Sequence, residues 1–505
     1  MSSTISEKDI EKIVEMVLKN VEQFTQKAPV ESLPVQQVQT GVPILMMTPL
    51  GTIGNDGVFD RVEDAIDAAY GAQKEYAKAC TLEDRNRIIE TIRKTILANI
   101  DDLAMRIFTE TGLGRLEDKA AKVILAATKT PGTEDIKTSA LSGDYGLTIE
   151  EMGAFGLIGA VTPVTNPAET IIGNVISMIA AGNGVVFNVH PSAKNCSAYA
   201  VQLLNRAIVS AGGPENLVTM VKEPTLETVK VISSSPKVNL MVGTGGPALV
   251  KALLSSGKKA IGAGAGNPPV IVDGTADLAL AARSILEGAS FDNNILCIAE
   301  KEIFVLDSVA DELIYEFLKL ETHMLTKDEL EHVMALTLVA DEKIGAKSCS
   351  MGVQKEYHVA KAWVGQDASK IMAAIQKPMD QVKLLLCEVS MDHPYVQLEQ
   401  MMPVLPIVRV KTFEEAVEKA VEAEHGNRHT ASIFSRNVDN MTTFAKAINT
   451  TIFVKNAATL AGVGFKGEGC TTFTIAGPTG EGITSARTFT RVRRCVLAEG
   501  GFRII

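Results

Sequence analysis

This chain of 505 residues has fewer basic than acidic residues, and it has no long apolar runs. Lys and Arg number 49 against 60 Asp and Glu, which gives a formal net charge of −11. This acidic balance argues against a nucleic-acid partner held through its phosphates. The apolar stretches fall short of the roughly 18 residues that span a bilayer, so no membrane segment is expected. The N-terminus lacks a basic stretch followed by an apolar core, so we expect no secretory signal.

Cysteine shows no pairing or ligand pattern. The seven cysteines are widely spaced, and none belongs to a Cys-x-x-Cys or mixed Cys/His motif. An odd number at wide spacing argues against a disulfide framework and a zinc site, and it favours a reducing compartment. We therefore predict no metal site. A free cysteine is often a small buried hydrophobe, so cysteine content alone marks none of them as functional.

Short β-branched runs bounded by Gly, Pro or Asn are abundant. Long amphipathic helical patterns over 59–79 and 81–112 precede them. The strand-like runs, most of which lead into a helical pattern, lie within 146–164, 183–191, 238–246, 267–274, 300–308, 405–412, 429–437 and 451–456. Strands that alternate with helices imply parallel sheets joined by crossover helices. The predicted fold class is therefore α/β, with two doubly wound domains.

The first 42 residues stand apart from this pattern. Residues 6–23 place apolar side chains at three-and-four spacing, which is one stripe of an amphipathic α-helix. The stripe consists of Ile10, Ile13, Val14, Val17, Leu18 and Val21. Residues 24–42 are rich in Gln and Pro without a period, which is typical of a linker. From the residues alone, the helix either docks on its own domain or serves as a docking peptide for another protein.

Cys297 lies in a polar turn between two predicted elements. A helical pattern breaks at 291–294, and a strand pattern begins near Glu302. We expect such a thiol to be partly exposed and near helix ends that favour the thiolate, as a nucleophile requires. Taken alone the signal is weak, because any of the cysteines could simply be buried.

Other features could carry chemistry, each with a structural alternative. The glycines in 243–246 follow a strand and precede a helix, so their backbone could approach a phosphate at the helix start. An ordinary tight turn is the alternative. Glu399 precedes an apolar strand and, by itself, fits a solvated carboxylate. His190 and His393 each precede a proline, which is typical of a structural turn.

Five segments, taken in order, resemble the aldehyde dehydrogenase superfamily, in particular the CoA-acylating acetaldehyde and propionaldehyde dehydrogenases of bacterial ethanolamine and propanediol utilisation. They read TPVTNPAETIIGN, VVFNVHPSAKN, GAGAGNPPVIVD, FDNNILCIAEKEIFV and MMPVLPIVRV. The resemblance covers about residues 43–500. It implies an aldehyde dehydrogenase-like fold with an NAD-binding Rossmann-like domain, a catalytic domain and a small β extension for oligomerisation. The ranges expected for these parts are 43–138 with 153–264, then 265–485, and 139–152 with 486–505.

The resemblance also implies roles for individual residues. Cys297 falls on the family's nucleophile, which forms a thiohemiacetal with the aldehyde and, after hydride transfer to NAD, a thioester. Its backbone N–H is one expected donor to the oxyanion. The second is the Asn166 amide, although an ungapped match places Thr165 there, and both stay open. The residues expected to bind the nucleotide are Thr162, Pro163, His190, Ser192, Gly243, Thr244, Gly245, Gly246 and Glu399.

Two departures from the family pattern bear on the second substrate. Hydrolytic relatives carry a glutamate that activates water, whereas Ala263 stands at that position here. A methyl group cannot take a proton, so we expect the acyl group to pass to CoA and the reaction to be reversible. His393 is a candidate base for the CoA thiol, with a structural turn as the alternative. The turn at His190 lacks the family's acidic ribose ligand, so NADP use stays open.

The N-terminal helix gains a meaning from the same resemblance. Microcompartment enzymes of this branch carry such a helix, which implies docking of residues 6–23 to shell proteins and a place in the lumen of a bacterial microcompartment. The family also implies a homodimer or homotetramer. The alternatives are a hydrolytic or phosphate-reducing relative, or a catalytically idle cargo or scaffold protein. Acetaldehyde and propionaldehyde differ by one methylene, worth only about 1–3 kcal/mol in a pocket, so the aldehyde stays open.

Overall fold

The first sheet is parallel throughout and has the strand order β1-β6-β5-β4-β7-β8. Its strands are β1 (Val58–Phe59), β4 (Leu157–Val161), β5 (Gly184–Asn188), β6 (Val218–Val221), β7 (Val238–Thr244) and β8 (Lys259–Ala263). The chain runs outward from β4 through β5 to β6 and then returns to the other side of β4 as β7. Such a reversal leaves a crevice beyond the carboxyl ends of the strands, where open α/β sheets bind ligands.

The computed structural model of the protein describes residues 56–344 and 353–502. The predicted N-terminal helix at 6–23, the linker at 24–42 and residues 43–55 of the first predicted domain lie outside the described residues. Within the described ranges, no helix is both long and apolar enough to cross a membrane.

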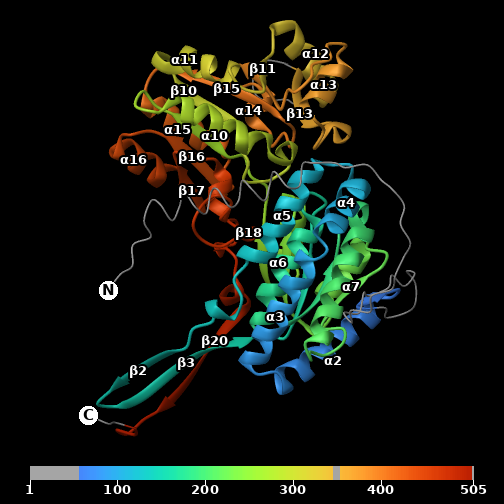
Figure 1. Cartoon of the computed structure of the whole chain (residues 1–505). Helices are drawn as coiled ribbons and strands as arrows, with labels where there is room; N and C mark the ends of the chain where they lie inside the picture. The colour runs from blue at the N-terminus through green and yellow to red at the C-terminus, as the bar shows by residue number, and fades with distance from the viewer. Residues whose placement is uncertain (1–55, 345–352, 503–505) are drawn as a thin grey trace, which may run out of the picture. The chain divides into compact units, whose positions relative to one another are not determined.

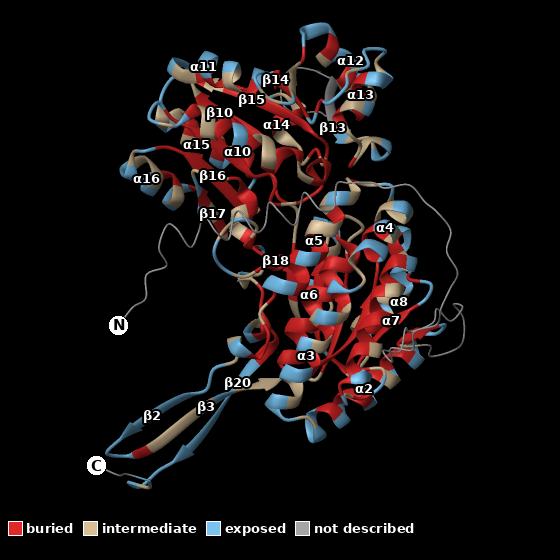
Figure 2. Ribbon diagram, in the orientation of Figure 1, coloured by how far each residue is buried: buried red, intermediate tan, exposed pale blue. Residues whose placement is uncertain are grey.

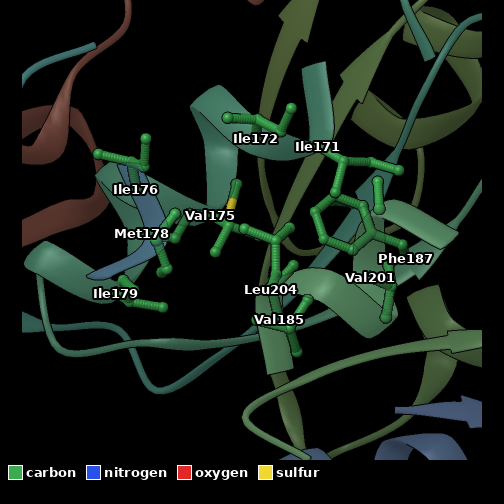
Figure 3. Close-up of a cluster of buried hydrophobic side chains, with 14 of the residues drawn as sticks. Ile171, Ile172, Val175, Ile176, Met178, Ile179, Val185, Phe187, Val201 and Leu204 are labelled. Atoms are coloured by element: carbon green, nitrogen blue, oxygen red, sulfur yellow. The ribbon is translucent and has the colours of Figure 1, made fainter. Parts of the chain in front are cut away.

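Helices pack on both faces of the first sheet, because neighbouring residues of a strand point to opposite faces. Ile158 of β4 joins one hydrophobic cluster and Leu157 joins another. Figure 3 shows the first cluster, where α6 packs against β5 and α7. The helices of this region are α2 (Val62–Ala79), α3 (Leu82–Leu97), α4 (Ile100–Thr111), α5 (Leu116–Lys129), η1 (Thr133–Asp135), α6 (Pro167–Ala180), η2 (Pro191–Ala193), α7 (Lys194–Ser210), α8 (Leu226–Ser234) and α9 (Pro247–Leu254).

The helical pattern over 81–112 forms two helices, α3 and α4, rather than one. A capping box between Thr81 and Asp84 starts α3. The break falls at Asn99, whose Nδ2 donates to the carbonyl oxygen of Thr95 at 2.7 Å. Asparagine side chains compete with backbone groups for hydrogen bonds in this way, which favours helix ends over helix interiors. The apolar period continues across the break, so the pattern alone could not show it.

The second sheet is also parallel and has the order β11-β14-β15-β10-β9-β16-β17. Its strands are β9 (Pro269–Val272), β10 (Glu302–Leu306), β11 (Thr322–Met324), β14 (Leu384–Glu388), β15 (Val404–Val410), β16 (Thr430–Phe434) and β17 (Ile452–Lys455). Ile303 and Phe304 of β10 again point into separate clusters. Two doubly wound sheets in the described residues confirm the predicted fold class.

The remaining elements of this region surround the second sheet (Figure 1). They are α10 (Leu278–Ser290), η3 (Phe291–Asn294), α11 (Asp307–Leu318), α12 (Lys327–Thr337), η4 (Lys361–Trp363), α13 (Ala368–Ala374), α14 (Pro394–Gln397), α15 (Phe413–Ala423), α16 (Val438–Ile448) and η5 (Thr459–Val463). β12 (Leu338–Ile344) and β13 (Val353–Val359) form a separate antiparallel pair.

A narrow antiparallel ribbon consists of β2 (Ser139–Gly143), β3 (Gly146–Ala154) and β20 (Thr490–Leu497), with β3 in the middle. Figure 2 shows β2 and β20 as mainly exposed, in contrast to the buried strands of the two sheets. The ribbon joins segments far apart in the sequence, since Thr490 pairs with Ala154. Its role in oligomerisation stays a prediction.

The segment after β17 returns to the first sheet, although the sequence placed residues up to 485 in the catalytic domain. It contains β18 (Ile475–Ala476), β19 (Gly482–Ile483) and η6 (Ala486–Phe489). The Thr474 hydroxyl lies 2.9 Å from that of Thr244 and 3.1 Å from Oδ1 of Asn174. Ala476 and Phe489 join the core cluster of the first sheet. These elements are too short to show a period in the sequence.

Candidate active site

The crevice at the carboxyl ends of β4 and β7 is a cavity of about 490 Å³. This volume lies in the range typical of small-molecule sites. The loop after β4, the turn after β7, Cys297 and Glu399 all line it. The topology of the first sheet therefore brings nucleotide-site candidates and the candidate nucleophile to one cavity.

Cys297 follows a turn with unusual backbone. Asp292, Asn293 and Asn294 have φ angles of 49°, 53° and 64°, in the left-handed region. For most residues that region costs roughly 1–2 kcal/mol each, but Asp and Asn visit it more readily than other non-glycine residues. The composition of the 291–294 segment thus suits the conformation that ends α10 and presents Cys297.

Hydrogen bonds from buried side chains close this turn. Lys301 Nζ donates to the carbonyl oxygen of Asn294 at 2.7 Å and to that of Leu296 at 3.3 Å. Nδ2 of Asn294 donates to the carbonyl oxygens of Ala289 and Glu300 at 2.8 and 2.9 Å. The backbone on either side of Cys297 is therefore held in place before any substrate binds.

The Cys297 thiol is not set up as a thiolate in the ligand-free protein, contrary to the expectation from sequence. The residue is partly exposed, but burial of the thiol and, to a smaller extent, the Glu399 carboxylate raise its pKa to about 12 against the opposing effect of Lys301. The helix ends that were expected to favour the thiolate are outweighed by loss of water around the sulfur and by a nearby negative charge.

We predict that alkylation of Cys297 by iodoacetamide in the ligand-free protein accelerates about tenfold per pH unit from pH 7 to pH 9. With a pKa near 12, the thiolate fraction rises in proportion to hydroxide throughout this window. Glu399→Gln should speed the reaction at every pH, because loss of a carboxylate lowers the pKa of the thiol. The measurement is the loss of unmodified Cys297 peptide by mass spectrometry, with glutathione as the reference thiol. A plateau below pH 8.5 would contradict the prediction.

Asn166 lies beside Cys297 with its amide oriented. Its Oδ1 accepts a hydrogen bond from Lys122 Nζ at 2.7 Å, and its Nδ2 donates to Thr165 Oγ1 at 3.3 Å. A lysine can only donate, so the oxygen of the amide must face Lys122 and the NH2 group must face away. Asn166 and Cys297 line the same cavity walls. Between the two candidates for the second oxyanion donor, this geometry favours Asn166, with Thr165 as its hydrogen-bond acceptor.

A second, much smaller cavity of about 20 Å³ also reaches Cys297 and Asn166. Its walls are mainly apolar and include Phe291, Leu460 and Phe465. A cavity needs about 10–15 Å³ to hold one water molecule, so this space suits a small apolar group. Cys297 therefore lines both the large cavity and the small, mainly apolar one.

Most of the predicted nucleotide-binding residues line the larger cavity. These are Thr162, Pro163, His190, Thr244, Gly245, Gly246 and Glu399. A Cβ on Gly246 would meet no neighbouring atom, so the start of α9 is open to a ligand. Backbone N–H groups at such a helix start attract phosphate. The donor set and the volume fit a dinucleotide.

Gly243 and Ser192 are outside the lining of this cavity. A Cβ on Gly243 would overlap the side chain of Leu253, so this glycine allows α9 to pack closely on β7. The exposed Ser192 donates its backbone N–H to Nδ1 of His190 at 3.2 Å, which fixes the ring that does line the cavity. Burial, helped by Lys361, lowers the pKa of His190.

Glu399 reaches the cavity from the loop before β15. Its Oε1 accepts from the backbone N–H of Gly266 at 3.4 Å. Burial raises the pKa of this carboxyl, although Lys301 and the Gly266 N–H oppose the shift. The sequence could not distinguish this partly buried position from an ordinary solvated carboxylate.

The structure does not bring His393 into the cavity. His393 caps α14, with Nδ1 accepting from the Tyr395 N–H at 3.2 Å and Nε2 3.2 Å from the Met334 sulfur. This arrangement favours the structural-turn interpretation. Ala263 ends β8 and is 2% exposed, while its neighbours Gly264 and Ala265 line the cavity. Among the described lining residues, Glu399 is the single carboxylate.

Sequence reasoning missed three buried residues at this site: Lys122, Lys301 and His429. Nδ1 of His429 lies 2.9 Å from Oγ1 of Thr430, within hydrogen-bonding distance. Burial lowers the pKa of His429 to about 4. A Cβ on Gly266 would touch both the His429 ring and the Cys297 carbonyl, so these two groups are close neighbours. A usable signal existed for Lys122, because it occupies a position on the apolar stripe of α5.

Comparison with known proteins identifies relatives of this chain. A model of the aldehyde dehydrogenase family matches residues 8–483. The acetaldehyde dehydrogenase (acetylating) EutE of Salmonella typhimurium is 46% identical over 476 residues, which is 93% of this chain and 99% of that protein.

Two solved structures extend the comparison. A propionaldehyde dehydrogenase from the Clostridium phytofermentans fucose utilisation bacterial microcompartment is 48% identical, with a TM-score of 0.84 over 89% of this chain and 100% of that one. A Rhodopseudomonas palustris propionaldehyde dehydrogenase with bound CoA and an acylated cysteine is 47% identical, with a TM-score of 0.82 over 88% and 98%. The chain belongs to the aldehyde dehydrogenase family.

Proposed function

We propose that this protein oxidises a short aldehyde with NAD and CoA to acyl-CoA and NADH, and that the reaction runs in both directions. The observation that carries the proposal is the place of Cys297, at the junction of a cavity fit for a nucleotide and a tight apolar cavity. The relatives named above are named for acetaldehyde and propionaldehyde, and the mainly apolar walls of the small cavity suit an alkyl group.

The chemistry follows from the groups around Cys297. Its sulfur attacks the aldehyde carbon as the thiolate, after the thiol proton has passed to solvent, and the resulting alkoxide is stabilised by the Cys297 N–H and Nδ2 of Asn166. Bound NAD would supply the hydride acceptor, so that loss of hydride from the thiohemiacetal alkoxide leaves a thioester on Cys297. The CoA sulfur then attacks the thioester carbonyl as its proton is lost, the carbon–sulfur bond to Cys297 breaks, and the Cys297 thiolate that leaves is reprotonated as the acyl-CoA forms. Exchange between two thioesters is close to thermoneutral, so the step is reversible.

Residues of the larger cavity would hold the nucleotide. The Gly245 N–H already donates to the Ala263 carbonyl oxygen at 3.0 Å, so the Gly246 backbone at the start of α9 suits the pyrophosphate. The loop at Thr162 and Pro163 with His190 suits the adenosine half. Glu399 suits the nicotinamide ribose. The absence of an acidic side chain at the turn after His190 leaves room for a phosphate there, so NADP and the 3′-phosphate of CoA could be accommodated too.

Transfer to CoA rather than water follows from the lack of a suitable base. Ala263 has no group that takes a proton, and Glu399, the one carboxylate among the described lining residues, serves the ribose in this proposal. Water is a poor nucleophile without general-base help, which is worth about 10²–10⁴-fold. A hydrolytic function is therefore disfavoured.

The direct test of this function is the product ratio. Incubation of the protein with propionaldehyde or acetaldehyde, NAD and CoA should yield acyl-CoA and NADH in a one-to-one ratio. Acyl-CoA with NADH should return the aldehyde. Free acid as the main product would favour the hydrolytic alternative, and no NADH at all would favour the idle cargo protein.

We further propose that the helix predicted at 6–23 binds microcompartment shell proteins and places the enzyme in the lumen. We predict that a truncation starting near residue 40 keeps its kcat within about twofold, because the described site uses no residue before 56. The same truncation should lose co-purification with shell proteins. Retained encapsulation of the truncated enzyme in a shell-expressing cell would contradict the docking role.

The antiparallel ribbon is proposed as the oligomerisation element of a homodimer or homotetramer. It exposes large apolar side chains, namely Leu141, Tyr145, Val492, Val496 and Leu497. Exposed apolar groups gathered on one element are typical of an interface. Sedimentation of the intact chain tests the proposal, and a stable monomer at micromolar concentration would contradict it.

A further inference from the structure

A buried charge network lies next to the two groups that would stabilise the oxyanion. Its members are Lys119 and Lys122 of α5, Glu169 of α6 and Asp292 of the turn before Cys297, with side chains 0–1% exposed. The network connects α5, α6 and η3, three elements that meet beside Cys297. Fully buried charges are costly unless they are paired and hydrogen-bonded, so their concentration at this point calls for a reason beyond folding.

Lys122 is the centre of the network. Its Nζ lies 2.6 Å from Oδ2 of Asp292, 3.0 Å from Oε1 of Glu169 and 2.7 Å from Oδ1 of Asn166. It also donates to the carbonyl oxygen of Thr165 at 3.2 Å. Burial disfavours its charge, but Asp292 and Glu169 outweigh this and raise the pKa of Lys122. The side chain thus stays a cation.

These contacts leave Lys122 no proton for a substrate. An ammonium group has three protons, and four oxygens compete for them in the described structure. Although Lys122 contributes to the wall of the apolar cavity, direct proton transfer or substrate binding is therefore disfavoured. What Lys122 does control is the amide of Asn166, since reversing that amide would put an NH2 group against the ammonium.

Asp292, which pairs with Lys122, belongs to the turn that leads to Cys297. Its Oδ1 accepts from the backbone N–H of Arg115 at 2.9 Å, and its own N–H donates to Oδ2 of Asp118 at 2.8 Å. These bonds hold the first residue of the left-handed turn that leads to Cys297. Lys119 Nζ also donates to Oδ2 of Asp292 at 2.8 Å, so Asp292 and the turn are held without Lys122, and Asp292 serves as a fixed partner for the Lys122 ammonium.

We propose that Lys122 is a positioning residue that fixes the Asn166 amide with its NH2 toward the reacting carbon on Cys297, and that Asp292 holds Lys122 in place. Lys122 acts through Asn166 and does not touch the substrate. The inference rests on the proposed function, because it assigns a role within that reaction.

The test is a double-mutant cycle of Lys122→Met and Asn166→Ala, measured as kcat with aldehyde, NAD and CoA. Each single variant should lose about 10²–10³-fold in kcat, the effect of removing one oxyanion donor. In the Asn166→Ala background, Lys122→Met should cost less than about threefold more, because the group through which it acts is already gone. KM for NAD should stay within about twofold in both.

Lys119→Met is the matched control. Lys119 is an equally buried lysine of α5 that pairs with Asp292 at 2.8 Å, but it does not contact Asn166. It should lower the melting temperature about as much as Lys122→Met does, while kcat falls less than about fivefold. An effect of Lys119→Met on kcat equal to that of Lys122→Met would overturn the proposal, since both would then act through folding of the site.

Alkylation of Cys297 by iodoacetamide separates the proposal from general damage. That reaction forms no oxyanion, so its rate should change less than about threefold in Lys122→Met. If Lys122→Met does not fold, the charge-balanced Lys122→Met/Glu169→Gln variant replaces it, with the same expected loss of kcat. Additive losses in the cycle, or normal kcat in the charge-balanced variant, would overturn the proposal. Failure of the proposed function itself would appear differently, as a wild-type enzyme that forms no acyl-CoA.

Discussion

Replacement of Cys297 by alanine is expected to lower NADH formation by at least about 10⁴-fold, comparable to losses seen when other enzymes lose their nucleophile. Without the sulfur no thiohemiacetal forms, and a free aldehyde or its hydrate is a poor hydride donor. The groups that remain, including the Asn166 amide and the nucleotide cavity, would have no covalent intermediate to act on. Binding of NAD should persist, because the thiol forms only a small part of the cavity wall.

The measurement is steady-state NADH absorbance with aldehyde and CoA in excess, together with NAD binding by fluorescence. Cys470→Ala is the matched control. Cys470 is also partly exposed, and burial raises its pKa as well, but it lines neither cavity that reaches Cys297. Its removal should leave kcat within about twofold. If Cys297→Ala kept more than about 1% of the wild-type rate, the nucleophile would have to be another group.

Omission of CoA is expected to stop the reaction after a single turnover. In its absence the thioester on Cys297 has only water as acceptor, Ala263 cannot assist water, and Glu399, the carboxylate among the described lining residues, serves the ribose in the proposed function. We expect a burst of about one NADH per chain, followed by a rate about 10²–10⁴-fold lower than with CoA, the factor that general-base help is worth.

Stopped-flow NADH absorbance or fluorescence measures both phases, and later addition of CoA should restore the full rate at once. A matched variant is Ala263→Glu, which places a carboxylate at the position where hydrolytic relatives carry one. It should raise the slow CoA-independent phase while lowering the yield of acyl-CoA. Steady NADH formation by the wild type without CoA, at a rate near that with CoA, would contradict the account.

The parallel sheets could be predicted because their signals are local. Runs such as 183–191 and 267–274 are β-branched and bounded by turn residues, and each became a buried strand, β5 and β9. The return of residues 472–489 to the first sheet could not be predicted, since β18 and β19 are two residues long and depend on tertiary hydrogen bonds. The break at Asn99 was hidden by an apolar stripe that continues through it.

Some residues of the candidate site could likewise be predicted from the sequence, and others could not. Cys297 and Glu399 could be identified through ordered family segments, and most nucleotide-site candidates line one cavity. Gly243 and His393 could not be separated from these by motif, because packing against Leu253 and capping of α14 depend on distant residues. The raised pKa of the thiol likewise arises from burial, which no local pattern reports.

Lys122 is a residue of the site that the sequence analysis did not identify. It lies 44 residues from Asn166 in the sequence and on another helix, so no spacing rule connects the two. The sequence does contain one indication of its role: Lys122 occupies a position where the period of α5 predicts an apolar residue. A charged residue on the apolar face of a predicted helix is therefore a candidate for a role in a nearby functional site.

The central claim is that Cys297 carries the acyl group and gives it to CoA rather than to water. The most direct measurement is peptide mass spectrometry of the enzyme after incubation with propionaldehyde and NAD but no CoA. The account predicts a propionyl group on the Cys297 peptide that persists for many turnover times and disappears within one when CoA is added, with propionyl-CoA as the product. An unmodified Cys297 peptide, or an acyl group that leaves as free acid at the same rate with and without CoA, would contradict it.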